Sequence, residues 1–122
     1  MKVLIVDDSK AIRTYLTHLA GECSFETEVA CDGQEAWEKL EQGARFDLAL
    51  VDWDMPRMNG LEFVQAVRAK EELNEMKMMM VTTQNSMEKV ATAIESGAND
   101  FLMKPLDQAM FQDKLKLLGF NW

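Results

Sequence analysis

The chain has 122 residues, 48% of them hydrophobic, and its 21 acidic and 13 basic side chains give a net charge of −8 at pH 7. This length and apolar content predict one globular domain spanning residues 1–122, with a core that needs neither a disulfide nor a bound metal cluster. The negative charge repels phosphates and anionic lipids, so we expect neither nucleic acid nor a membrane surface as a partner.

The cysteines and the N-terminal sequence indicate the cellular compartment. Cys23 and Cys31 are the two cysteines and form no CxxC pair, so we expect both to be reduced thiols. The apolar part of the opening sequence MKVLIV is too short for a signal peptide and leads directly into two aspartates. No later apolar run is long enough to span a bilayer. We therefore expect a cytoplasmic protein.

Strand and helix patterns alternate along the first half of the chain. The run KVLIV at 2–6 predicts a strand buried on both faces, and apolar residues at helical spacing follow it, with Ser9 as the helix cap. FETEVA at 25–30 predicts a more exposed strand, followed by a helix that Asp32 caps. FDLALV at 46–51 predicts the third strand, and the turn PRMNG leads from it into the third helix.

The alternation continues in the second half. MKMMMVTT at 76–83 predicts the fourth strand, although Met is a weak strand former. The helix that follows is expected to end at Gly97. NDFLMK at 99–104 predicts the fifth strand, and Asp107 caps the last helix. The charged stretch AKEELNEMK at 69–77 is expected to be a solvated loop.

Five strands that alternate with five helices predict parallel βαβ units with right-handed crossovers. The expected architecture is therefore an α/β fold with a doubly wound parallel sheet and helices on both faces. In such sheets ligands bind outside the carboxyl ends of the strands. The residues just past each strand are the candidate site.

Acidic, hydroxyl and amino groups follow four of the predicted strands. The first strand is followed by Asp7 and Asp8, the third by Asp52 and Asp54, the fourth by Thr82 and Thr83, and the fifth ends in Lys104. Clustered carboxylates repel one another unless a cation lies among them. Their oxygens suit Mg²⁺, for which Mn²⁺ could substitute. With the ammonium group of Lys104 and the hydroxyl of Thr82, these residues predict an aspartyl-phosphate site with a carboxylate nucleophile.

With the motifs VDD, LVDWDMPRMNG, VTT and FLMKP in this order, the chain resembles the receiver domain of bacterial two-component response regulators, most of all stand-alone, CheY-like receivers. The resemblance covers essentially the whole chain. It implies a flavodoxin-like sheet of strand order 2-1-3-4-5 and a single receiver domain without an output domain. The implied function is a phosphorylation-activated signalling switch of a two-component, chemotaxis-type system. Such a protein is not a conventional enzyme, since it catalyses only its own phosphorylation and dephosphorylation.

The resemblance also implies a role for each of the four aspartates. Asp52 would accept the phosphoryl group from a histidine kinase or a histidine phosphotransfer protein. Asp8 and Asp52 would bind Mg²⁺ through their side chains. Asp7 would act largely through water, and Asp54 through its backbone carbonyl.

The remaining motif residues would bind the phosphoryl group and transmit its presence. Lys104, joined to Pro105 by a cis peptide bond, would pair with the phosphoryl group, and Thr82 would hydrogen-bond it. Phe101 would move inward when Thr82 moves. A downstream protein, such as a flagellar switch protein or another regulator, would then bind the face formed by the fourth helix, the fifth strand and the fifth helix. We expect the protein to be a monomer.

Two other classes of protein share part of this pattern. Asp52 and Asp54 resemble the DxD motif of haloacid-dehalogenase-like phosphatases, in which the second Asp is a general acid. That motif lies on the first strand, whereas here Asp7 and Asp8 come first. A flavin-binding module would need a phosphate loop where this chain has DDSKA. Within the receiver interpretation, Asp54 could orient or deprotonate the water that hydrolyses the phosphoryl group, or its charge could repel a phosphodonor and compete for Mg²⁺ and Lys104. For loading, electrostatics favours the second effect.

Overall fold

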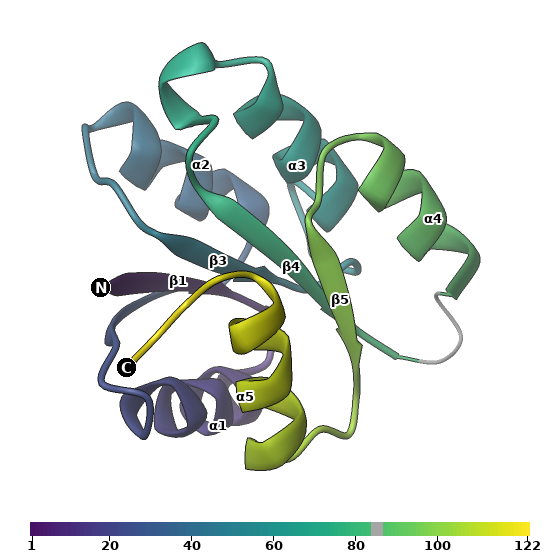
Figure 1. Cartoon of the computed structure of the whole chain (residues 1–122). Helices are drawn as coiled ribbons and strands as arrows, with labels where there is room; N and C mark the ends of the chain where they lie inside the picture. Colours follow the sequence, from purple (N-terminus) through teal and green to yellow (C-terminus); the bar gives the residue numbers. More distant parts are fainter. Residues whose placement is uncertain (84–86) are drawn as a thin grey trace.

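The computed structural model describes residues 1–83 and 87–122, which form one sheet with helices on both faces (Figure 1). The strands are Lys2–Val6 (β1), Glu26–Ala30 (β2), Leu48–Val51 (β3), Lys77–Thr82 (β4) and Asp100–Met103 (β5). The helices are Lys10–Gly21 (α1), Gly33–Glu41 (α2), Gly60–Arg68 (α3), Met87–Glu95 (α4) and Gln108–Leu117 (α5), with a 3₁₀ turn at Glu71–Leu73 (η1). None of the helices in the described ranges has the length and apolarity that a bilayer crossing requires.

The strand order is β2-β1-β3-β4-β5, and all neighbouring strands are parallel. This is the flavodoxin-like order that the resemblance to receivers implied. Helices α1 and α5 cover one face of the sheet, and α2, α3 and α4 cover the other (Figure 1). Val6, Val51 and Met80 lie side by side on β1, β3 and β4 and belong to the buried cluster of the second face. Buried on both faces, these central strands hold their carboxyl ends in fixed positions relative to one another.

The predicted helix caps are present. The side chains of Ser9, Asp32 and Asp107 each accept the backbone N–H of the residue three positions on, at 3.3, 2.8 and 2.9 Å. Helix α3 has a capping box, formed by Asn59 and Glu62, that the sequence pattern did not predict. Each cap fixes the point at which the chain leaves a loop at the carboxyl edge of the sheet.

The segment at 69–77 differs from its prediction as a solvated loop. It contains the 3₁₀ turn η1, and the side chains of Leu73 and Met76 are buried in the same cluster as Val51 and Met80. The charged residues around these two side chains concealed a short apolar pattern with a spacing of three. The segment therefore closes the core between α3 and β4.

Arg68, the last residue of α3, links this helix to the turn before β5. Its guanidinium group donates to the carbonyl oxygens of Gly97 and Met76 at 2.9 and 2.8 Å and to Oδ1 of Asn99 at 3.0 Å. The same Asn99 oxygen accepts the N–H of Met78 at 2.8 Å. Because each acceptor is oriented by the backbone, these bonds hold the turn between α4 and β5 against β4.

Helix α4 is attached to the sheet through small side chains. Its buried residues, among those whose burial is described, are Val90 and Ala93. Helix α3 instead buries Phe63, Val64 and Val67. Since apolar stabilisation scales with the area removed from water, the described residues of α4 contribute less to the core than those of α3.

Candidate functional site

Three aspartates gather at the carboxyl edge of the sheet. Asp7 and Asp8 follow β1 and Asp52 follows β3, and these adjacent strands are paired so that Val6 lies beside Val51. One carboxylate oxygen of each aspartate lies within 4.8 Å of the others. The exposed fractions of Asp7 and Asp52 are 1% and 9%, while Asp8 faces solvent. The fold therefore brings together three of the four predicted acids, Asp7, Asp8 and Asp52.

The ammonium group of Lys104 lies between two of these carboxylates. Its Nζ is 3.0 Å from Oδ2 of Asp7 and 3.4 Å from Oδ1 of Asp52. The backbone N–H of Lys104 donates to the carbonyl oxygen of Thr82 at 2.7 Å, which extends the β4–β5 pairing past the end of β5. The bond to Pro105 is cis. Lys104 thus reaches the aspartates from the end of β5, across β4.

Each buried carboxylate is also held by the backbone. Oδ1 of Asp7 accepts the N–H of Ser9 at 2.9 Å, and Oδ1 of Asp52 accepts the N–H of Trp53 at 2.9 Å. Among the described residues, no hydrogen bond reaches Oδ2 of Asp52. One oxygen of Asp52 is therefore fixed, and the other is available to a ligand.

Burial raises the pKa of the Asp52 carboxyl group from its ordinary value of 3.8 to about 6. The negative charge of Asp7 acts in the same direction, while Lys104 and the N–H of Trp53 oppose the rise. Burial also acts to lower the pKa of Lys104, but its hydrogen bond to Asp7 and the charge of Asp52 outweigh this effect and raise it. One ammonium group therefore offsets only part of the negative charge at this edge.

The donor set of this cluster fits a hard divalent cation. Asp7, Asp8 and Asp52 offer carboxylate oxygens and no sulfur or nitrogen ligand, which is the preference of Mg²⁺ and Mn²⁺. Exposure of Asp8 leaves room for the water ligands that Mg²⁺ retains. Both oxygens of Asp7 already accept hydrogen bonds, which suits the indirect role implied for it.

Asp54 lies outside the cluster. Its side chain is 73% exposed, and its Oδ1 is 3.5 Å from Nζ of Lys89, a residue of α4. The same Nζ lies 5.6 Å from the centroid of the Trp53 ring. Competition for Lys104, expected from the sequence, is not what the structure shows: the cation next to Asp54 is Lys89.

Thr82 and Phe101 occupy neighbouring strands on the side of the cluster toward α4. Thr82 is buried at the end of β4. Phe101 is half-buried on β5, packs against the core cluster under α4, and pairs in register with Met80. Nζ of Lys114 lies 5.1 Å from the centroid of its ring. The ring is thus partly inserted and partly accessible.

The sequence did not predict the ion pair between Arg57 and Asp32 near the site. Arg57 donates to both carboxylate oxygens of Asp32 at 2.9 and 3.2 Å, and the N–H of Gly33 donates to the carbonyl oxygen of Met58 at 3.0 Å. Arg57 has a positive φ of 65°. These bonds join the loop after β3 to the start of α2. No spacing rule reveals such a pair, because the two residues are distant in the chain and Arg57 lies in an irregular turn.

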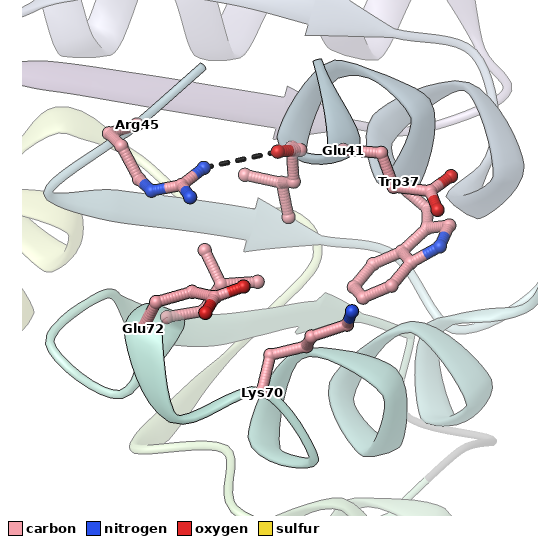
Figure 2. A pocket seen from close by; sticks show the side chains of 7 residues that line it. Trp37, Glu41, Arg45, Lys70 and Glu72 are labelled. Carbon is pink, nitrogen blue, oxygen red and sulfur yellow. Dashed lines mark hydrogen bonds between the residues drawn. The ribbon is translucent and has the colours of Figure 1, made fainter. Parts of the chain in front are cut away.

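A separate hollow lies between α2 and the segment after α3 (Figure 2). Its lining consists of Trp37, Leu40, Glu41, Arg45, Lys70, Glu72 and Leu73. These residues come from α2 and the loop after it, and from the segment after α3 that includes η1. The aspartate cluster lies at the other end of these helices, where they begin. The hollow therefore contributes no group to the cluster.

The fold and the site together define a class of protein. A five-stranded doubly wound sheet that places acids after its first and third strands and a lysine after its fifth is the arrangement of a small α/β signalling domain. Residues 3–116 match the family described as the response regulator receiver domain. The chain belongs to this family.

Its relatives are chemotaxis proteins. The chain is 37% identical to chemotaxis protein CheY1 of Helicobacter pylori over 99% of each chain. It is 38% identical to the chemotaxis protein CheY homolog of Campylobacter jejuni, over 95% of this chain and 90% of that one. The solved structure of chemotaxis response regulator CheY4 of Vibrio cholerae matches with a TM-score of 0.86 and 39% identity, over 96% of this chain and 97% of that one.

These findings settle the class of function. The chain is a phosphorylation-activated signalling switch of the two-component, chemotaxis type and not a conventional enzyme. Proteins of this kind interact with histidine kinases and with downstream targets. The phosphatase alternative gains no support from the matches.

The raised pKa of Asp52 predicts a change of stability with pH in metal-free protein. Because the carboxyl pKa is higher in the folded state than its ordinary value, ionisation destabilises the fold as the pH rises from about 4 to about 6. Asp52→Asn should therefore raise the free energy of unfolding at pH 7 by about 1–3 kcal/mol, a gain that disappears below about pH 4. Urea denaturation in the presence of a chelator measures both values.

The matched control for this prediction is Asp54→Asn, since Asp54 is an exposed carboxylate two residues away. It should change the free energy of unfolding by less than about 0.5 kcal/mol at either pH. An Asp52→Asn protein that is less stable than the parent at pH 7 would contradict the account of the site.

Proposed function

We propose that Asp52 is the phosphoacceptor of this switch and takes the phosphoryl group from the phosphohistidine of a histidine kinase or a histidine phosphotransfer protein. The environment of Asp52 carries the proposal. Its Oδ1 is held by Lys104 and by the N–H of Trp53, while Oδ2 accepts no hydrogen bond from the described residues. A nucleophile fixed through one oxygen presents the other in a defined direction, which lowers the entropic cost of transfer.

In the proposed transfer, Oδ2 of Asp52 attacks the phosphorus atom. The new O–P bond forms as the P–N bond to the donor imidazole breaks, and the electron pair of that bond stays on the imidazole nitrogen. Mg²⁺, or Mn²⁺ in its place, would neutralise charge on the transferring group. Asp8 and Asp52 would hold the ion through their side chains, Asp7 through water and Asp54 through its backbone carbonyl.

Lys104 and Thr82 are proposed to bind the phosphoryl oxygens. The ammonium group of Lys104 already lies 3.4 Å from Oδ1 of Asp52, so it can donate to a phosphoryl oxygen after a small movement. The hydroxyl of Thr82 would supply a second donor from the end of β4.

We expect incubation with acetyl phosphate and Mg²⁺ to add one phosphoryl group to the parent protein, measured by intact mass. Asp52→Asn should abolish the added mass, because an amide oxygen is too weak a nucleophile. Asp54→Asn is the control and should still be modified. If Asp52→Asn is modified and Asp54→Asn is not, the acceptor has been assigned to the wrong aspartate.

We expect Mg²⁺ to stabilise the fold, because a divalent cation relieves the repulsion among Asp7, Asp8 and Asp52. At a concentration of about 100 times Kd, binding to the folded state alone adds about 2.7 kcal/mol to the free energy of unfolding. Thermal denaturation across a Mg²⁺ titration measures the effect. Asp8→Ala should remove most of it, whereas Asp113→Ala, an exposed acid on α5, should not. An unchanged Tm across the Mg²⁺ titration of the parent protein would exclude a metal site at this cluster.

Phosphorylation is proposed to change the partner-binding face through movements of Thr82 and Phe101. Movement of the Thr82 hydroxyl toward the phosphoryl group would vacate space that the half-buried ring of Phe101 can fill. The ring lies on β5 under Lys114 of α5, so its movement changes the face formed by α4, β5 and α5. We propose that a downstream protein binds this face and that the receiver is monomeric.

Thr82→Ala should accept phosphate and yet fail to switch, because the acceptor carboxylate is intact while the hydroxyl that couples it to Phe101 is missing. Amide chemical shifts of α4 and β5, recorded with and without beryllofluoride and Mg²⁺, measure the switch. Thr83→Ala, which alters the exposed neighbour, is the control and should show shifts of parental size. Full-sized shifts in Thr82→Ala would show that switching follows another route.

A further inference from the structure

Lys89 joins the signalling helix to the segment that carries the phosphoacceptor. It lies in the first half of α4, and its Nζ contacts the two residues that follow Asp52. The distance is 3.5 Å to Oδ1 of Asp54 and 5.6 Å to the centroid of the Trp53 ring. One cation from a distant part of the chain therefore lies beside both residues that follow the acceptor.

This ion pair contributes little to folding. The side chains of Lys89 and Asp54 are 46% and 73% exposed, and exposed pairs in water are weak. Trp53, by contrast, is buried. Its backbone is hydrogen-bonded to the start of α3, since the N–H of Gly60 donates to the Trp53 carbonyl oxygen at 2.9 Å. The Trp53 ring is thus a fixed support for the Lys89 ammonium group, whereas the Asp54 carboxylate beside it is exposed and can move.

The charges around Asp52 explain what such a cation does. Asp7, Asp8 and Asp52 form the acidic cluster, and Lys104 offsets one of their charges. Asp54 adds a further carboxylate two residues after the acceptor, and its side chain is 73% exposed to solvent. Without a cation next to Asp54, an anionic donor would meet this carboxylate before it reached Asp52.

We propose that Lys89 is a second cation of the phosphoacceptor site, supplied by α4, that neutralises Asp54 and so sets the rate at which anionic phosphodonors load Asp52. The inference rests on the proposed function, since it concerns the same transfer. Lys89 is a positioning residue here: it acts through Asp54 and the local field, and Asp52 remains the nucleophile. The loading rate should depend most strongly on Lys89 for the donors with the most negative charge.

The test is a set of loading rates with acetyl phosphate at saturating Mg²⁺ and low ionic strength, followed by intact mass. Lys89→Met keeps the side-chain stem over Trp53 and removes the charge, and should slow loading about 3- to 10-fold. Asp54→Asn should speed loading, and the double variant should return to within about twofold of the parent, because the pair is then absent as a whole. Lys89→Arg keeps the charge and should load at the parental rate.

Two further conditions separate local charge from other causes. The effect of Lys89→Met should shrink at about 0.5 M salt, where the Debye length is only a few Å. It should also be smaller with phosphoramidate, which carries less negative charge at neutral pH than acetyl phosphate. Lys77→Met is the control for net charge, because Lys77 is exposed at the opposite end of β4, and should leave the rate unchanged.

The inference is overturned if Lys89→Met loads at the parental rate at low salt, or if Lys77→Met slows loading equally. It is also overturned if Asp54→Asn loads more slowly than the parent, since Asp54 would then assist transfer. A parent protein that takes up no phosphoryl group contradicts the proposed function and this inference with it. Normal loading of the parent without any effect of Lys89→Met contradicts the inference alone.

Discussion

Two buried carboxylates, those of Asp7 and Asp52, share a single ammonium group at the carboxyl edge of the sheet. Because neighbouring parallel strands end side by side, Asp7, Asp8 and Asp52 lie close together, and water solvates the exposed Asp8 far better than the other two. The folded protein therefore holds more negative charge at this edge than Lys104 can offset. A cation that binds there is favoured by a repulsion that the core has already imposed on the acids.

The same edge is tied to the rest of the molecule by backbone bonds. Lys104 donates its N–H to the carbonyl oxygen of Thr82, so the cation and the hydroxyl expected to bind a phosphoryl group belong to one paired strand unit. Gly60 shows how tightly the other side is packed, since a Cβ on it would lie 2.3 Å from the Asp52 carbonyl oxygen. The start of α3 thus lies directly against the acceptor segment, with no room for a side chain at Gly60.

Much of this arrangement could be predicted from the sequence because short-range rules determine it. Buried apolar runs located the strands, hydroxyl and carboxyl caps located three helix starts, and the rule for parallel sheets placed Asp7, Asp52, Thr82 and Lys104 at one edge. The strand order came from the resemblance to receivers. The neighbour of Asp54 could not be predicted: its pairing with Lys89 depends on where α4 lies over the loop after β3, which is a property of tertiary packing. The buried Leu73 and Met76 were concealed by the charged residues around them.

Among the residues of α4 whose burial is described, two small side chains attach the helix to the core. Removing Val90 and Ala93 from their buried contacts would cost roughly 2–3 kcal/mol. A few charge-assisted hydrogen bonds to a bound anion contribute a similar amount. The buried side chains of α3, Phe63, Val64 and Val67, would by the same measure require roughly two to three times as much. The described contacts of α4 therefore place its conformational equilibrium within the range of free energy that a single covalent modification can supply.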